Sequence, residues 1–389
     1  MPIASGDAVA LARALVRVDS RNPSLVPGAP GERAVAELLA GILREWEFRV
    51  ELYDALPGRP NVVARIGKPG GRVLMFNGHL DVVGVEGMTH APWDAAEWGD
   101  RIYGRGSSDR KSGIAAMCAA AARIAGEIDG EVIVAAVADE EYESAGTRSL
   151  IERGIRADAA IVTEPTRLAI MPAHLGFVWI DVTTHGRAAH GSRWDLGVDA
   201  IRHAGLVLSE LDRFDAEELP KRRHSLLGRP SVHASMISGG IGMSTYPDKC
   251  TVQIERRTIP GESPDVVRQE IESVCERAGQ RRENFRADVM VTFAQEPSDV
   301  AVDAPIVAAL ESALRESNED VRVQGMTAWT DAALLNAAGI PAICFGPGDI
   351  GLAHAAEEYV MIEEIERATR VLAQLALHWC RDPMAAWRS

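Results

Sequence analysis

Five blocks of acidic and imidazole residues, spread over most of the 389-residue chain, constrain what this sequence can fold into. Each block follows a short apolar run or lies in a glycine-rich segment, and the blocks are far apart in sequence. Only a fold that gathers the ends of several elements at one place brings them together. The blocks centre on His79, Asp109, the Glu140-Glu141 pair, Glu164 and His354.

The elements between these blocks predict an α/β sheet. Apolar residues recur three or four apart in three segments, which predicts helices over 7–17, 31–46 and 111–125. Short, continuous apolar runs predict buried strands at 73–76, 131–138 and 159–162. Strands that alternate with helices favour a mostly parallel mixed sheet. Ligands of such sheets bind beyond the carboxyl ends of the strands, where several of the blocks fall.

The pattern of apolar and polar residues changes after about residue 174. Half-exposed strands and two amphipathic helices, over 197–213 and 263–278, predict a smaller α+β insert. Alternating helices and strands resume at Pro305. We therefore predict a catalytic α/β domain made of residues 1–174 and 295–389, interrupted by an α+β domain of residues 175–294.

Charge and composition narrow the class of protein. The formal net charge is −15 and there is no long basic stripe, so we expect no nucleic-acid partner. No apolar run is long enough to cross a bilayer, and charged residues interrupt the first helix where a signal peptide would need an apolar core. The five cysteines lack paired spacing, which indicates reduced thiols and a cytoplasmic protein.

Each block alone has an ordinary structural explanation. His79 could be a histidine in a strand-end turn, and His354 an ordinary loop histidine. Asp109 could cap a helix, and Glu164 could be an exposed glutamate. Together, two histidines, one shareable aspartate and several glutamates are the ligand set of a site with two divalent metals. Asp81 is near enough to accept the second imidazole N–H of His79. The set favours a metal-dependent hydrolase.

The run Asp139-Glu140-Glu141 adds a candidate base. Three acids at the end of a buried strand repel one another, so a cation is expected beside them. One glutamate can then bind metal while its neighbour faces the attacking water as general base. Glu357 and Glu358 follow His354 and could orient it.

In this order, the blocks resemble the acetylornithine deacetylase and succinyl-diaminopimelate desuccinylase family. That family belongs to a larger di-zinc peptidase group with aminoacylases and carboxypeptidases. The likeness covers nearly the whole chain, and five blocks in one order are far more specific than any one of them. They are Gly78-His79-Leu80-Asp81, Tyr103-Gly104-Arg105-Gly106 through Asp109 and Lys111, Asp139-Glu140-Glu141, Thr163-Glu164-Pro165-Thr166, and the Gly-Pro-Gly segment before His354.

The resemblance implies a role for each block. One zinc would be bound by His79, Asp109 and Glu164. The other would be bound by Asp109, Glu141 and His354, so that Asp109 bridges the two. Glu140 would be the general base and then the proton donor to the leaving amine. Cobalt or manganese are alternative metals.

The resemblance also gives the insert a role as the dimerisation or lid domain of a homodimer. His190 would reach the active site of the partner subunit and stabilise the oxyanion. Arg257 would grip a substrate carboxylate. Ser244 stands where the family usually has asparagine, three residues before Pro247, so a substrate contact is expected to differ.

The expected function is removal of an acyl group from an N-acyl amino acid by a cytoplasmic, homodimeric di-zinc amidohydrolase. A dipeptidase or carboxypeptidase of the same group is the alternative, because the metal chemistry is the same. Two further readings come from other classes: a mononuclear iron oxygenase, which also uses two histidines and a carboxylate, and a non-catalytic binding protein on this scaffold.

Overall fold

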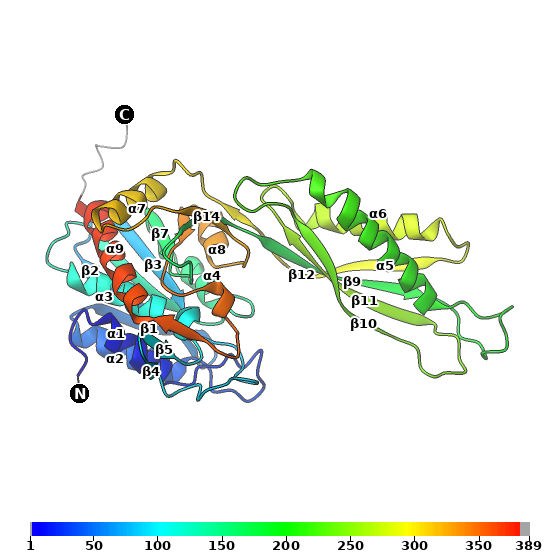
Figure 1. The fold of residues 1–389 in the computed structure, drawn as a ribbon, viewed down its shortest axis with the longest axis horizontal. Coiled ribbons are helices and arrows are strands. Elements are labelled where there is room, and N and C mark those ends of the chain that lie inside the picture. Colours follow the sequence, from blue (N-terminus) through cyan, green and yellow to red (C-terminus); the bar gives the residue numbers. More distant parts are fainter. Residues whose placement is uncertain (1, 382–389) are drawn as a thin grey trace. The chain divides into compact units, whose positions relative to one another are not determined.

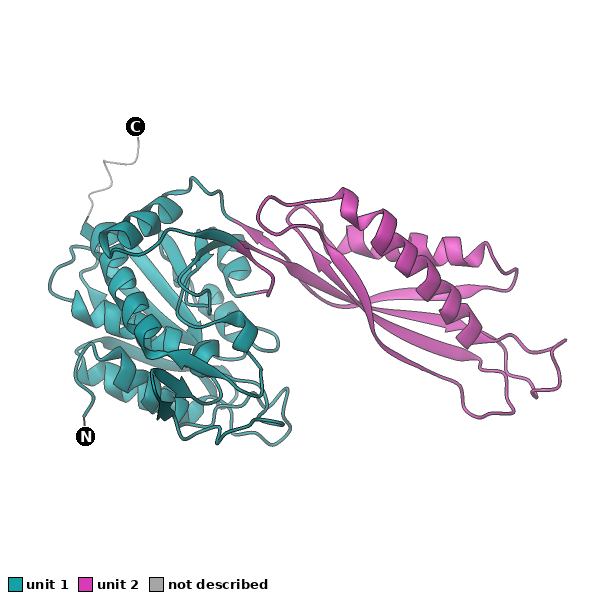
Figure 2. Cartoon of the chain, in the orientation of Figure 1, with its two compact units in different colours: residues 1–172, 300–324, 330–389 teal, residues 173–299, 325–329 magenta. Residues whose placement is uncertain are grey.

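The computed structural model describes residues 2–381, which divide into two compact units (Figure 2). Unit 1 contains the described residues up to 172, residues 300–324 and those from 330 onward. Unit 2 contains residues 173–299 and the short segment 325–329. The predicted catalytic domain includes residues 325–329, because five residues are too few for a periodic pattern that would separate them from their neighbours.

Unit 1 is built on a mixed sheet whose central strands are parallel, which confirms the predicted α/β fold (Figure 1). The flanking pairs are antiparallel. The analysis did not predict the antiparallel hairpin that extends the sheet at 49–67. In spatial order the strands are β1 (Arg49–Leu56), β2 (Arg59–Gly67), β6 (Glu131–Val137), β3 (Val73–His79), β7 (Ala159–Val162), β15 (Ala342–Cys344) and β8 (Ile170–His174).

Helices cover both faces of this sheet. One face carries α1 (Ala8–Val16), α2 (Arg33–Glu45), α3 (Ser112–Arg123), α7 (Pro305–Glu316) and α9 (Ile362–Arg381). The other face carries α4 (Ala145–Glu152) and α8 (Ala332–Ala337). Three of these helices match the predictions over 7–17, 31–46 and 111–125 to within two residues at each end.

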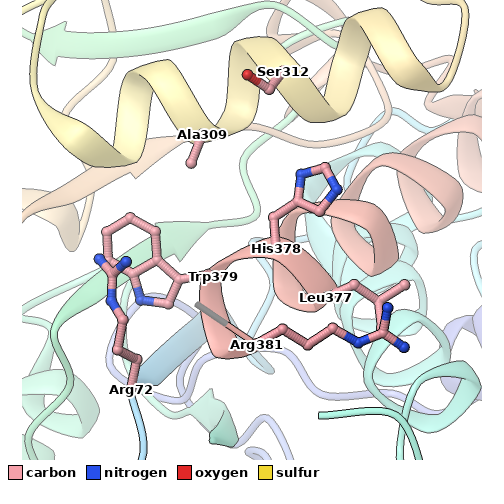
Figure 3. A pocket seen from close by; sticks show the side chains of 7 residues that line it. All are labelled: Arg72, Ala309, Ser312, Leu377, His378, Trp379 and Arg381. Carbon is pink, nitrogen blue, oxygen red and sulfur yellow. The ribbon is translucent and has the colours of Figure 1, made fainter. Parts of the chain in front are cut away.

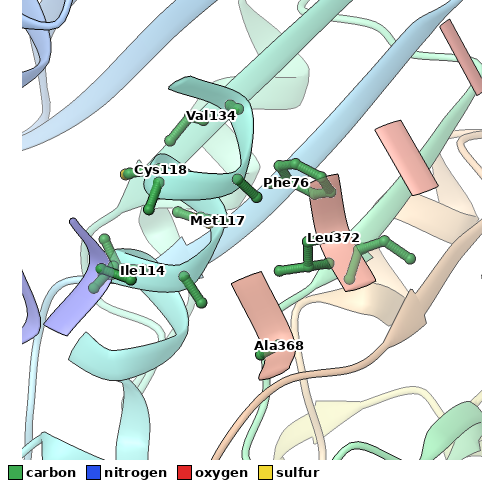
Figure 4. Close-up of a cluster of buried hydrophobic side chains, with 14 of the residues drawn as sticks. Phe76, Ile114, Met117, Cys118, Val134, Ala368 and Leu372 are labelled. Atoms are coloured by element: carbon green, nitrogen blue, oxygen red, sulfur yellow. The ribbon is translucent and has the colours of Figure 1, made fainter. Parts of the chain in front are cut away.

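The main core lies between the sheet and the larger helical layer (Figure 4). Phe76 of β3 and its neighbour Val134 of β6 point toward α3 and α9, where Leu372 packs. Because side chains alternate along a strand, Met75 and Ile133 are buried against the opposite layer. Truncating a buried residue such as Phe76 to alanine would cost about 3–5 kcal/mol.

A small antiparallel sheet joins two loops of unit 1. Its strands are β4 (Ala96–Trp98), β5 (Arg101–Tyr103) and β16 (Tyr359–Met361), in the order β16-β5-β4. The sheet holds the segment 104–111 beside the segment 350–358, because these follow β5 and precede β16. Short helical turns lie at Ser107–Lys111 and Ile350–Leu352.

Unit 2 is a four-stranded antiparallel sheet with two helices. The strand order is β10 (Ser231–Gly239), β11 (Lys249–Thr258), β9 (Gly176–His185) and β12 (Arg286–Gln295). The helices α5 (Ala200–Glu217) and α6 (Pro264–Gly279) cover the apolar side of the sheet. Asp199 and Ser263 cap them by accepting a backbone N–H. The short strands β13 (Ser298–Asp299) and β14 (Val323–Met326) lie near the points where the chain passes between units.

Over the described residues, no helix combines the length and apolarity that a membrane span requires.

Candidate metal centre

The carboxyl ends of neighbouring strands in unit 1 carry the predicted site residues. His79 is the last residue of β3 and lies opposite Val137, the last residue of β6. Glu140 follows β6, and Glu164 follows β7 by two residues. Because β6, β3 and β7 are parallel neighbours, these side chains meet at one edge of the sheet.

Asp109 lies between the two predicted histidines. Its Oδ1 is 3.3 Å from Nε2 of His79, and its Oδ2 is 3.4 Å from Nε2 of His354. Glu141 Oε2 is 3.1 Å from the same nitrogen of His354. Ligand atoms of His79, Asp109 and Glu141 all lie within 4.8 Å of one another. The structure therefore brings together four of the five predicted ligands, with the two oxygens of one carboxylate facing two imidazoles.

Glu358 holds the Asp109 backbone in place. Its buried carboxylate accepts the backbone N–H groups of Ser108 and Asp109, each at 3.0 Å, and pairs with Arg105 at 2.6 Å. The expectation that Glu357 and Glu358 orient His354 is therefore wrong for Glu358, and Glu357 is exposed. This contact of Glu358 could not be predicted, because the small sheet that creates it is made of three-residue strands.

Glycine at position 113 lets the Asp109 segment approach the end of β7. A Cβ at Gly113 would lie 2.3 Å from the carbonyl oxygen of Thr163, which no real side chain tolerates. Any larger residue there would push the start of α3 away from the strand end that carries Glu164.

Asp81 fixes three residues at the same edge of the unit 1 sheet, His79, Glu140 and Glu141. Nδ1 of His79 donates to the backbone oxygen of Asp81 at 2.8 Å, whereas the Asp81 carboxylate is 3.6 Å from that nitrogen. The carboxylate accepts the backbone N–H groups of Glu140 and Glu141, both at 3.1 Å, and the side-chain amide of Asn22 at 2.8 Å. Asp81 thus fixes the imidazole through its backbone and the two glutamates through its side chain.

A buried ion-pair network supports Asp139, the first acid after β6. Arg59 Nη1 is 2.7 Å from Asp139 Oδ1, and the same guanidinium pairs with Glu32. Asp139 has a positive φ of 68°, an unusual conformation for a residue other than glycine. These contacts hold the turn that presents Glu140 and Glu141. Sequence reasoning missed Arg59 and Glu32, which come from elements far from the blocks.

Glu164 has a different partner from the other predicted ligands. It forms an ion pair with Arg110, whose side chain is fully buried. Burial raises the pKa of Glu164 to about 7, although the Arg110 charge opposes this. Asp331, at the start of α8, is also buried here and accepts a hydrogen bond from Thr147 at 2.6 Å. Neither Arg110 nor Asp331 was predicted from the sequence as a residue of the site.

The acids of the site hold protons on the two imidazoles. Hydrogen bonds to Asp109 and Glu141 raise the pKa of His354 to about 11. Burial alone would lower the pKa of His79, but the Glu140 carboxylate and its neighbours raise it well above its usual value. The same histidines outweigh burial at Asp109 and hold its pKa below the usual range. Such a set of oxygen and imidazole donors with excess negative charge suits divalent cations.

The comparison with known proteins agrees with this arrangement. The family model of peptidase family M20/M25/M40 matches residues 75–378, a span that includes every residue of the site described above except Arg59, Glu32 and Asn22. The chain belongs to this family.

Relatives with assigned activities differ in substrate. The acetylornithine deacetylase of Myxococcus xanthus is 33% identical to this M20 chain over 343 residues, which cover 85% of the chain and 86% of the relative. The N-formyl-4-amino-5-aminomethyl-2-methylpyrimidine deformylase of Bacillus subtilis (strain 168) is 28% identical to this chain. The alignment covers 91% of this chain and 91% of the relative.

Solved structures show the same fold. A dinuclear metal binding peptidase of the M20 family from Bacillus subtilis is 18% identical, with a TM-score of 0.72 and coverage of 96% of this chain and 97% of that one. The M20 chain is therefore a hydrolase of this family on a known scaffold.

The remaining predicted site residues of this M20 hydrolase lie in unit 2. The loops of His190 and Ser244 pair with each other, because Gly191 donates its N–H to the Ser244 carbonyl at 2.7 Å. His190 is exposed, and its Nδ1 is 2.8 Å from Ser192 Oγ. Arg257 of β11 donates through Nε to Glu255 at 2.6 Å. Their roles toward a substrate remain predictions.

A separate pocket of unit 1 lies between α7 and the end of α9 (Figure 3). Arg72 stacks on the Trp379 ring, 3.6 Å from its centroid, and Arg381 pairs with Glu127. None of the predicted ligands lines this pocket.

Proposed function

We propose that the protein is a metal-dependent amidohydrolase that removes an acyl group from an N-acyl amino acid. The observation that carries the proposal is the position of Asp109, whose two oxygens face the Nε2 atoms of His79 and His354. A carboxylate in this position can bridge two cations. An isolated helix cap would need only one of its oxygens.

The residues present fit two divalent ions, with zinc as the expected metal and cobalt or manganese as alternatives. Asp109, Glu141 and His354 would hold one ion, and His79, Asp109 and Glu164 the other. Bound metal would polarise the amide carbonyl and lower the pKa of a coordinated water to about 7. The donor atoms are nitrogen and oxygen, and the five cysteines are free and buried elsewhere in the core.

We propose Glu140 as the general base. Its Oε2 lies 3.6 Å from His79 Nε2, beside the ligand set, while its backbone is fixed by Asp81. Burial raises the pKa of Glu140 well above its usual value, which makes its carboxylate a stronger base. Glu140 would take the proton of the attacking water and deliver it to the leaving amine.

Unit 2 would supply substrate contacts and the dimer interface. We propose that Arg257 binds the substrate carboxylate, that His190 stabilises the oxyanion in the site of the partner subunit, and that Ser244 alters one substrate contact. β10 lies at an edge of the sheet, and its residues Met236 and Ile237 are exposed. An exposed apolar edge strand of this kind invites pairing with a second copy. The free cysteines support a cytoplasmic enzyme.

The substrate class follows from the relatives rather than from the metal site. Proteins named as a deacetylase and a deformylase are similar to this chain over most of its length, which favours N-acyl substrates over peptides. A dipeptidase or carboxypeptidase is the second candidate, because several solved structures with this fold are peptidases.

A substrate screen tests the proposal. Metal-depleted protein is reloaded with zinc, cobalt or manganese and incubated with N-acetyl, N-formyl and N-succinyl amino acids and with dipeptides, and the released amine is measured. Glu140→Ala, purified in parallel, controls for contaminating hydrolases. We expect metal-dependent release from N-acyl amino acids. Faster turnover of dipeptides would favour the second candidate, and no turnover with any metal would favour a binding protein.

A further inference from the structure

Arg110 places a positive charge inside the proposed metal centre. It directly follows Asp109, and its side chain has no exposed surface. Its Nη1 forms an ion pair with Glu164. Among the described residues, Nε and both Nη atoms have no partner that meets hydrogen-bond geometry. A buried guanidinium normally satisfies several of its five N–H donors, so this contact is one of charge more than of hydrogen bonding.

The surroundings of Arg110 are acidic. The carboxylates of Glu164, Glu140, Asp109 and Asp331 all act on its charge. The guanidinium is thus the fixed cation of a cluster that otherwise depends on protonated imidazoles or metal for positive charge. Burying such a charge costs several kcal/mol unless its partners compensate for the lost water.

Glu164 cannot pair closely with Arg110 and bind a metal ion at the same time unless one of the two contacts is weakened. The carboxylate oxygen that faces Arg110 is Oε1, which is buried. A divalent ion bound to Glu164 would lie close to the guanidinium, and like charges at short range in a partly desolvated site repel strongly. In the described part of the chain, neither His354 nor Glu141 pairs with an arginine, so these two ligands of the second position carry no such conflict.

We infer that Arg110 is a built-in counter-cation that competes with metal for Glu164, so that the position formed by His79, Asp109 and Glu164 loads weakly and only when Arg110 moves away. The position formed by Asp109, Glu141 and His354 would load first. This inference rests on the proposed function, since it assumes that the residues bind metal. It adds that one residue sets the difference in affinity between the two positions.

The alternative roles for Arg110 predict other behaviour. If the guanidinium binds the substrate carboxylate, its removal raises KM and leaves metal binding unchanged. If the ion pair is only structural, its removal lowers the melting temperature equally with and without metal. Competition for Glu164 alone predicts that removing the charge strengthens metal binding.

The experiment is equilibrium dialysis of metal-depleted protein against buffered Zn²⁺, with bound metal counted by mass spectrometry. Wild type is compared with Arg110→Met, which keeps the length of the side chain, and Arg110→Gln, which can still donate to Glu164. Arg110→Lys keeps the charge. Glu164→Gln removes the contested ligand and identifies its position.

We expect the wild type to bind one ion tightly and a second at least ten-fold more weakly. Arg110→Met and Arg110→Gln should bind the second ion about ten-fold more tightly than the wild type, and Arg110→Lys should resemble the wild type. Glu164→Gln should lose the weak ion and keep the tight one. Visible absorbance of Co²⁺-loaded protein gives a second record of the same filling order.

Identical isotherms for wild type, Arg110→Met and Arg110→Gln would overturn the inference. Should Arg110→Met not fold, Arg110→Gln still decides the matter, because it removes the charge with less loss of hydrogen bonding. Melting with zinc and with chelator is a further check, since competition predicts a larger metal-induced rise in both neutral variants. If no variant binds metal, it is the proposed function that fails, and the two outcomes are therefore distinct.

Discussion

The carboxylate of Asp81 accepts the backbone N–H of Glu140 at 3.1 Å, and so the segment after β3 holds the turn that follows β6. Its other oxygen accepts the N–H of Glu141, also at 3.1 Å. The two glutamates share one anchor, yet their side chains face different partners: Glu140 lies near His79 and Glu141 near His354. This division of a shared turn is the structural basis for giving them separate roles.

Replacing the two glutamates one at a time tests that division. We expect Glu140→Ala to lower kcat by about 100- to 10,000-fold, the range for loss of a general base, with metal content unchanged. Glu141→Ala, on the same anchor, should lose metal as well as activity. Zinc per subunit and turnover are measured on the same preparations. Loss of metal from Glu140→Ala would show that Glu140 is a ligand and that the base assignment is wrong.

Arg257 is the next candidate for a substrate contact. Its guanidinium is held by Glu255, which also accepts the indole N–H of Trp179 at 2.9 Å. A guanidinium suits a carboxylate, so Arg257→Ala should lower kcat/KM for an N-acyl amino acid more than for its amide. Glu255→Gln, which loosens the competing ion pair, should favour the carboxylate substrate. An equal loss on both substrates in Arg257→Ala would mean that the pair with Glu255 is structural.

His174 should make stability depend on acid. It is buried in unit 2, and burial lowers its pKa to about 4. The unfolded chain, with a pKa near 6.5, binds a proton at higher pH than the folded one, so stability falls as pH drops from about 6.5 to about 4. We expect a loss of about 2 kcal/mol between pH 7.5 and 5 from this group.

Urea denaturation at those two pH values measures the effect. His174→Asn, whose amide can replace the N–H that His174 Nδ1 donates to the Leu175 carbonyl at 3.0 Å, should lose about 2 kcal/mol less than wild type. His233→Asn, at an exposed position of β10, is the matched control. If His174→Asn and wild type lose stability in parallel, another group controls the acid response.

The sequence was informative where a residue type coincided with a strand end. His79, Glu140 and Glu164 follow apolar runs that became β3, β6 and β7, so the rule for parallel sheets was enough to place them together. Asp109 and His354 lie in loops, which this rule does not place, and the family resemblance was needed to assign them to particular metal ions. The mixed sheet of unit 1 and the antiparallel sheet with two helices in unit 2 followed from the change of pattern near residue 174.

Sequence reasoning missed residues whose importance depends on burial. Arg110 lies between an aspartate and a lysine, which gives no sign of burial, yet it has no exposed surface in the fold. Glu358 was expected to orient His354, but β16 brings it to the Asp109 backbone, and Asp331 was missed until α8 placed it at the site. Strands as short as β16 carry too few residues for a period of two to be recognised, so their partners could not be predicted.

The last prediction concerns His190, which we propose completes the site of the partner subunit. Its exposed position in unit 2 fits a residue that acts on another chain. Its ring contacts Ser192 Oγ through Nδ1. We therefore expect Nε2 to be the nitrogen that faces an oxyanion. Either His190→Ala or Glu140→Ala alone should be nearly inactive, with metal retained in both.

Mixing the two inactive variants separates a shared site from a self-contained one. After subunit exchange, a hybrid dimer has one site with His190 from one chain and Glu140 from the other, both intact. We expect recovery of up to about half the wild-type activity per hybrid dimer, if the sites act independently. Exchange is verified with differently tagged chains, and mixing each variant with itself is the control. If hybrids form and no activity returns, His190 acts within its own subunit or has no catalytic role.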